Sequence, residues 1–116
     1  MATAVARARY LRIAPRKVRL VADLIRGKKV AHARDILAFT TKRSAPVLGK
    51  LLAAAVANAE SKAAESRESV DTDEMVVHRV VVDGGPTLKR GRAAPRGRYV
   101  RIRHRTSHVE LVISDL

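Results

Sequence analysis

Eight lysine and arginine side chains lie between Gly84 and His108, and no carboxylate lies among them. They are Lys89, Arg90, Arg92, Arg96, Arg98, Arg101, Arg103 and Arg105. Such side chains bind phosphate, and each guanidinium can pair with phosphate oxygens through two parallel donors. The stretch has too few large apolar residues to offset an ordering entropy of roughly 1 to 2 kcal/mol per residue. We therefore expect a polyanion outside the protein core to hold it.

Other groupings that could carry chemistry are weaker. His104 and His108 have the spacing of a helical zinc pair, but four residues on a strand span about 13 Å, too far for one metal ion. Ser107 and His108 are neighbours on a strand and point to opposite faces, so they do not form a nucleophile and base. Gly84 and Gly85 precede a proline and a strand, whereas a phosphate-binding loop needs a helix there. We expect no enzyme, no metal site and no cofactor.

The basic stretch alternates as a strand does from Tyr99 onward. One side carries Tyr99, Arg101, Arg103, Arg105 and Ser107, and the other carries Val100, Ile102, His104 and Thr106. A second arm, Met75 to Asp83, is rich in valine and leads into a bend at residues 84–86. Residues 91–97 are expected to form the turn around Pro95. The pattern predicts a hairpin projecting about 40 Å, at about 3.3 Å per residue. A disordered basic loop is the alternative, and the regular alternation argues against it.

Three helices are predicted before this hairpin. The first begins at Pro15, which suits a first helical position, and stops at Gly27, which suits a left-handed one. The second is marked by the apolar residues from Val30 to Leu37 and ends near Thr40. The third begins at Ser44, a candidate N-cap, and turns leucine and alanine side chains inward.

Two further segments read as strands. Residues 4–13 alternate and are expected to turn Arg7 and Arg9 outward, and residues 109–113 restore an apolar run. The acidic segment 60–74 reads as a frayed helix end and an exposed loop without a function. The predicted fold class is α+β, with three helices packed on a small antiparallel three-stranded sheet and a long protruding β-hairpin. We expect a single domain, residues 1–116, made of a globular part, residues 1–83 and 109–116, and an extended basic hairpin, residues 84–108.

Charge is segregated along the chain. The 116 residues carry a net charge of +13, with 9 basic and 1 acidic residues in 1–30, 7 and 8 in 31–83, and 8 and 2 in 84–116. A near-neutral middle between two basic ends indicates a polyanion binder, and nucleic acid is favoured over a membrane because no basic amphipathic helix with bulky aromatics is present. Cysteine is absent, which excludes disulfides, and no apolar run approaches 18 residues. We expect a soluble cytoplasmic protein.

The first helix adds cations to this surface. Lys28 and Lys29 follow its negative end, where the dipole favours them, although solvated surface charges explain any single one equally well. The residues predicted to bind RNA are Arg7, Arg9, Arg12, Arg16, Lys17, Arg19, Lys28, Lys29, Lys89, Arg90, Arg92, Arg96, Arg98, Arg101, Arg103, Arg105 and His108. Folded RNA suits an extended basic hairpin, because its crowded phosphates can surround it.

Five motifs carry a resemblance to a known family. They are VRLVADLIRGKKV at 18–30, ANA at 57–59, VDGGP at 82–86, LKR at 88–90 and RTSH at 105–108. In this order they closely resemble the family of bacterial ribosomal protein twenty-two of the large subunit, over nearly the whole chain. The chain departs from the family pattern in its late Pro95, in a longer loop at 61–74, and in Ala14, which stands where the family commonly has a serine cap.

The resemblance implies a structural constituent of the large ribosomal subunit. It implies that the protein binds large-subunit ribosomal RNA, supports subunit assembly, and lines the nascent-peptide exit tunnel with its hairpin, beside ribosomal protein four. The implied tunnel-lining tip is Leu88, Lys89, Arg90, Gly91, Arg92, Ala93, Ala94, Pro95 and Arg96. Changes near 88–90 are implied to alter the response to macrolides. The implied partners are ribosomal RNA, neighbouring ribosomal proteins and the nascent peptide, with no membrane and no homo-oligomer.

A free nucleic-acid chaperone or DNA-compacting protein is the rival interpretation. Such a protein carries its charge on mobile low-complexity tails, whereas this chain places it on alternating strands and a helix with defined ends. Co-sedimentation with large subunits through a high-salt wash would separate the two.

Overall fold

The computed structural model describes residues 3–115. The elements in chain order are β1 (Thr3–Leu11), α1 (Pro15–Ile25), α2 (Val30–Phe39), α3 (Ser44–Glu65), a 3₁₀ turn η1 (Thr72–Glu74), β2 (Val76–Gly84), β3 (Leu88–Ala93), a 3₁₀ turn η2 (Pro95–Gly97), β4 (Tyr99–His104) and β5 (Ser107–Ser114).

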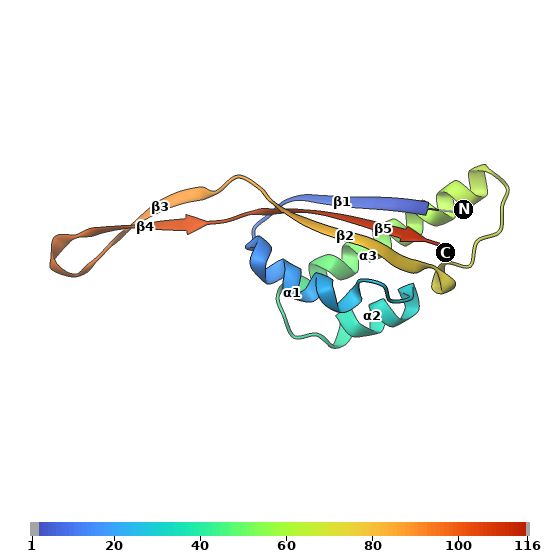
Figure 1. Cartoon of the computed structure of the whole chain (residues 1–116). Helices are drawn as coiled ribbons and strands as arrows, with labels where there is room; N and C mark the ends of the chain where they lie inside the picture. The colour runs from blue at the N-terminus through green and yellow to red at the C-terminus, as the bar shows by residue number, and fades with distance from the viewer. Residues whose placement is uncertain (1–2, 116) are drawn as a thin grey trace.

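Three strands form an antiparallel sheet with the order β1-β5-β2, so that the last strand of the chain lies in the centre. The helices cover one face of this sheet (Figure 1). The core between the two layers is aliphatic, and the completely buried Leu48 and Leu52 of α3 belong to the same cluster as Leu111 and Ile113 of β5. The predicted α+β fold class is confirmed.

The hairpin is a second, two-stranded sheet made of β3 and β4. It extends away from the globular layers, opposite the end where β1 begins and β5 ends (Figure 1). The molecule is accordingly elongated, with extents of 67 × 26 × 16 Å. The protruding hairpin predicted from the alternation is therefore present.

The position of the turn differs from the prediction. Gly91 was expected to open it, but this residue lies inside β3, opposite Arg101 of β4. The chain instead reverses around η2, where Arg96 (φ 62°) and Gly97 (φ 69°) both adopt left-handed conformations. The turn is thus shorter than the predicted segment 91–97, because Gly91 belongs to strand β3.

The first strand is also shorter than predicted. Tyr10 has a φ of 57°, and the pairing of β1 with β5 shifts between Ala8 and Leu11. A left-handed residue bends the strand and interrupts its alternation, so the segment 4–13 does not continue as a strand to Ile13.

The helices follow the sequence closely, apart from one cap. α1 begins at Pro15, and Gly27 adopts the left-handed conformation (φ 80°) that a helix stop requires. The N-cap of α3 is Arg43 rather than Ser44, and it makes no side-chain capping hydrogen bond. Ser44 lies in the first turn and is buried, so the hydroxyl that suggested a cap is packed inside the protein.

The acidic segment is partly ordered against α2. Asp73 pairs with Arg34 at 3.0 Å, and Glu74 pairs with Lys29 at 3.0 Å. Both pairs are exposed, so each contributes about 0 to 1 kcal/mol. The segment 60–74 therefore holds the end of α3 to Glu65, as predicted, and the short turn η1 within the segment that was predicted as an exposed loop.

Candidate nucleic-acid interface

The register of the hairpin places cations on both of its faces. Directly opposed residues of an antiparallel pair share a face, and Lys89 pairs with Arg103 while Arg90 pairs with Ile102. Lys89, Arg101 and Arg103 therefore lie on one face, and Arg90 and Arg92 lie on the other. A strand pair that is basic on both faces suits a ligand that surrounds it better than a flat ligand.

Two cations oppose each other directly within this ladder. Lys89 and Arg103 are both exposed and both positive, and like charges at opposed positions destabilise a strand pair. In the hairpin only Leu88 and Ile102 among the large apolar strand residues are half-buried. The distal hairpin thus lacks a core, and its positive charges are not balanced by carboxylates. An anionic environment would balance these charges.

Gly91 has a local function in β3. A Cβ added at this position would overlap the hydroxyl and ring of Tyr99, whose backbone pairs with Ala93. The aromatic ring therefore lies across the strand where the glycine leaves a gap, an arrangement known to support glycine in sheets.

The base of the hairpin is fixed to the globular part by backbone contacts, a region we call the neck (residues 84–87 and 105–108). The amide of Gly85 donates to the carbonyl of Thr106 at 2.9 Å, and the Thr106 hydroxyl donates to the carbonyl of Pro86 at 2.6 Å. The buried Ser107 hydroxyl donates to the carbonyl of Ile13 at 3.0 Å. A Cβ at Gly85 would lie 2.6 Å from Thr106 Oγ1, so only glycine fits this crossing without a shift.

His108 also lies at the neck. Its Nδ1 accepts a hydrogen bond from the Tyr10 amide at 3.1 Å, and the two rings meet edge to face at a centroid distance of 4.9 Å. The side chain predicted to bind RNA is therefore half-buried and uses one nitrogen inside the protein.

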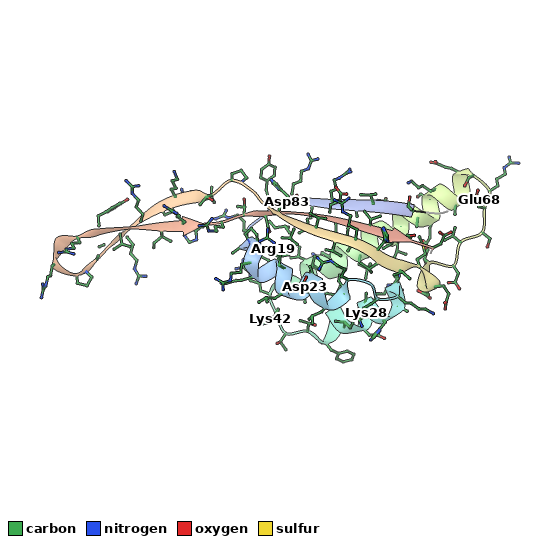
Figure 2. All side chains as sticks on the ribbon, viewed as in Figure 1. Arg19, Asp23, Lys28, Lys42, Glu68 and Asp83 are labelled. Carbon is green, nitrogen blue, oxygen red and sulfur yellow. The ribbon has the colours of Figure 1, made fainter. Side chains whose placement is uncertain are left out.

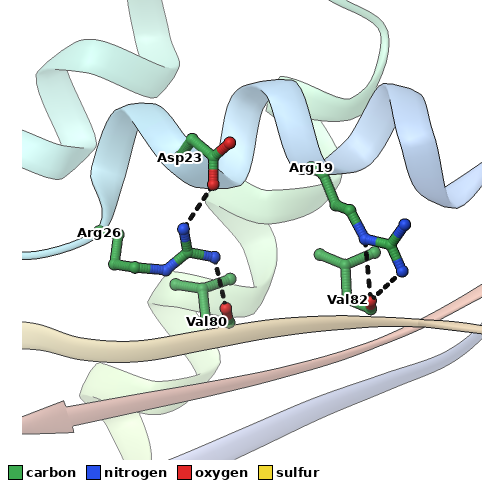
Figure 3. Close-up of polar contacts among 5 residues, drawn as sticks. All are labelled: Arg19, Asp23, Arg26, Val80 and Val82. Carbon is green, nitrogen blue, oxygen red and sulfur yellow. Dashed lines mark hydrogen bonds and ion pairs between the residues drawn. The ribbon is translucent and has the colours of Figure 1, made fainter.

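Arg19 of α1 and Arg26, the C-cap residue of this helix, both reach the edge of the sheet. Arg19 donates to the carbonyl of Val82 through Nε (3.2 Å) and Nη2 (2.8 Å), and Arg26 Nη2 donates to the carbonyl of Val80 at 2.7 Å while pairing with Asp23 (Figure 3). β2 is an edge strand, whose outward carbonyls would otherwise be free to pair with another chain. Arg19 was predicted to contact RNA, and two nitrogens of its guanidinium group donate to the protein's own backbone.

The other predicted cations fall into two groups, those with a partner in the protein and those without one. Arg7 pairs with Glu110 across the sheet at 3.1 Å, and Lys29 pairs with Glu74. Arg90 donates only to the carbonyl of its neighbour Lys89. Among residues 3–115, no hydrogen bond or ion pair is made by the charged groups of the following cations: Arg9, Arg12, Arg16, Lys17, Lys28, Lys89, Arg92, Arg96, Arg98, Arg101, Arg103 and Arg105.

A cleft of about 860 Å³ lies between the start of α1, the loop before α3 and the base of β4. The cations that line it are Arg12, Lys17, Lys42, Arg43, Arg103 and Arg105. Lys42 and Arg43 were not predicted, because the near-neutral segment 31–83 gave no charge signal. Figure 2 shows Lys42 on the loop that leads into α3, at the end of the helical layer nearer the hairpin.

Residues 3–115 contain no group of three or more histidine, aspartate or glutamate side chains arranged to hold a metal ion. Within the same residues, no helix combines the length and the apolarity that crossing a bilayer requires.

Comparison with known proteins identifies the family of this chain. The sequence model described as "Ribosomal protein L22p/L17e" matches residues 6–114. This chain belongs to that ribosomal protein family. Its relatives include the proteins named "Large ribosomal subunit protein uL22" of Staphylococcus aureus strains JH9 and Newman. Each is 52% identical over 108 residues, which cover 93% of this chain and 88% of the relative. The family resemblance inferred from the five motifs is confirmed.

Proposed function

We infer that this protein is a structural constituent of the large ribosomal subunit, with no enzymatic activity, and that it acts in the cytoplasm as part of the ribosome. It binds large-subunit ribosomal RNA, supports assembly of the subunit and contributes its hairpin to the wall of the nascent-peptide tunnel. Membership of the family supports this function. The observation that carries it within the molecule is the hairpin register, which distributes unpaired cations over both faces of an otherwise coreless strand pair.

We propose that RNA contact falls mainly on the predicted cations without a protein partner. The hairpin members are Lys89, Arg92, Arg96, Arg98, Arg101, Arg103 and Arg105, and the globular members are Arg9, Arg12, Arg16, Lys17 and Lys28. Arg90 and His108 join this set with one nitrogen already engaged. Arg7, Arg19 and Lys29 are placed outside this set, because each side chain already binds a carbonyl or a carboxylate of the protein itself.

The finer division of roles is also proposed. Residues 84–108 act as the hairpin module, residues 1–83 and 109–116 form the globular part, and the tip, residues 88–96, faces the tunnel. There it would meet the nascent peptide and lie beside ribosomal protein four. The exposed turn around Pro95 supports this assignment, because the side chains of Pro95 and Arg96 are open to a partner outside the protein.

Deletion of residues 88–90 tests the division between RNA anchorage and tunnel lining. The deletion leaves the three-stranded sheet and helices unchanged, but the loss of three residues from a strand redirects the side chains beyond it to opposite faces. Large subunits should incorporate the shortened protein and respond differently to macrolides or to stalling nascent peptides. Subunits that lack the shortened protein would show that the tip is an assembly anchor.

The ribosomal assignment itself is tested by sedimentation. The protein should remain with large subunits through a high-salt wash, since its hairpin is surrounded by RNA. Release of the protein at a salt concentration that leaves other subunit proteins bound would favour the free chaperone instead.

A further inference from the structure

The cleft gathers cations from three separate parts of the chain. Residue 12 comes from the turn before α1 and residue 17 from the first turn of that helix, residues 42 and 43 come from the loop before α3, and residues 103 and 105 come from the end of β4 and the neck. No carboxylate is among the lining residues, and the remaining walls include the apolar Ile13 and Leu20. The hollow is therefore a positively charged one, of a size that small molecules or short polymer segments occupy in proteins.

The cleft is distinguished by how many cations without a protein partner share one hollow. Elsewhere on the globular part, some cations pair with a carboxylate, namely Arg7, Arg26, Lys29 and Arg34, and others such as Arg9 and Lys28 have no side-chain partner among residues 3–115. None of the six cleft cations makes a side-chain hydrogen bond or an ion pair with any residue between 3 and 115. Six unpaired like charges around one hollow repel one another, and an anion that enters it removes this repulsion.

We propose that the cleft binds the sugar-phosphate backbone of a ribosomal RNA segment, and that this RNA fixes the direction of the hairpin relative to the globular part. The inference rests on the proposed function and deepens it. Backbone is favoured because the lining offers charge from several directions and only one aromatic-type ring, that of His104, on which a base could stack. RNA is favoured over an acidic peptide because Arg103 and Arg105 continue directly from the basic hairpin.

The effect on the hairpin follows from the walls of the cleft. Two walls belong to the helical layer and one belongs to the arm that leaves it. The two sheets share no strand, and the arms cross between them only at the neck. An RNA backbone bound between Lys42 or Arg43 and Arg103 or Arg105 would therefore act as a splint: it would hold this crossing in one orientation from outside the protein.

A matched pair of double variants tests the binding step. The cleft variant is Lys42→Gln with Arg43→Gln, and the control is Lys50→Gln with Arg67→Gln, which removes the same charge from exposed residues outside the cleft that have no side-chain partner in the described chain. Affinity for isolated large-subunit ribosomal RNA is measured between 50 and 200 mM salt. Loss of two phosphate contacts should reduce the log-log salt slope by about 1.4 to 1.8, so the parent loses roughly tenfold more affinity than the cleft variant over this range. The control should keep the parent slope.

A distance measurement tests the splint. The chain has no cysteine, so Glu60→Cys on α3 and Ala93→Cys at the end of β3 accept one spin label each. The distribution of distances between the labels should narrow at least twofold when the parent or the control binds the RNA. In the cleft variant it should stay as broad as in the free protein, even when RNA is bound through the hairpin.

The outcomes separate the two levels of the proposal. If the cleft variant keeps the parent slope, or if its distances narrow as the parent's do, the cleft is not the splint, while the ribosomal function stands. If an acidic peptide competes with RNA for the parent but not for the cleft variant at equal concentration of charge, the cleft is a peptide site and the inference is wrong. If the parent itself fails to bind the RNA, the proposed function fails.

Discussion

Arg19→Met should destabilise the protein without weakening its contact with RNA. The substitution keeps the apolar stem of the side chain and removes two hydrogen bonds, of 3.2 and 2.8 Å, to the carbonyl of Val82. A hydrogen bond from a charged donor contributes about 1.5 to 3 kcal/mol, and a neutral one about 0.5 to 1.5 kcal/mol. Because Arg19 is exposed and water can reach the vacated carbonyl, we expect a loss of about 1 to 1.5 kcal/mol.

Arg16→Met on the same helix is the matched control. Arg16 is exposed and has no side-chain partner among residues 3–115, so its replacement should change stability by less than about 0.5 kcal/mol. Urea unfolding followed by circular dichroism measures both variants. The midpoint should fall for Arg19→Met at an unchanged m-value, since the fold and its buried area stay the same.

Binding to RNA should give the opposite result for these two variants. The control removes a free cation and should lower the log-log salt slope by about 0.7 to 0.9, whereas Arg19→Met should leave the slope unchanged. Equal unfolding midpoints for the two variants, or a lower salt slope for Arg19→Met, would refute the assignment of Arg19 to the sheet edge.

Three further predictions concern the hairpin and the neck. In the free protein, backbone amides of residues 87–103 should exchange within seconds while helix amides stay protected; slow exchange of the hairpin would mean that it needs no RNA scaffold. Replacing Arg101, Arg103 and Arg105 together by glutamine should lower the salt slope on ribosomal RNA by about 2 to 3, and an unchanged slope would remove this face from the interface. Gly85→Ala should lower the unfolding midpoint, because its Cβ would lie 2.6 Å from a hydroxyl that is already bonded to Pro86; an unaltered midpoint would show that the crossing relaxes freely.

Local signals in the sequence predicted most of the fold. Pro15 and Gly27 mark the ends of the first helix because each has a backbone conformation that few other residues share, and the alternation after Tyr99 follows from the pleat itself. Ser44 was misassigned because a serine before an apolar run fits both a cap and a buried first turn. Only the packing of the chain around the residue distinguishes the two.

The candidate interface was less predictable than the fold. Charge patterns find cations but do not reveal which of them face a carbonyl or a carboxylate of the same protein. Arg16 and Arg19 are both basic residues of one helix, yet Arg19 alone meets an edge carbonyl. The cleft escaped prediction for a related reason, since Lys42 and Arg103 are 61 positions apart and are brought to the same hollow only by the tertiary fold.

The central place of β5 has a consequence for how the chain folds during its own synthesis. β1 and β2 do not pair with each other, and both are joined only through β5, which leaves the translating ribosome after every other strand. The helices can form early, but the sheet on which they pack cannot close until the last strand arrives, and the pairing of Thr3 with Ser114 spans almost the whole chain. Until β5 has emerged, β1 and β2 both have unpaired edges, and β2 is followed directly by the strongly basic hairpin segment. Formation of the sheet is therefore expected to be slow for a small domain, because it waits for the non-local pairing with β5, and the unpaired strand edges are open to aggregation during that interval.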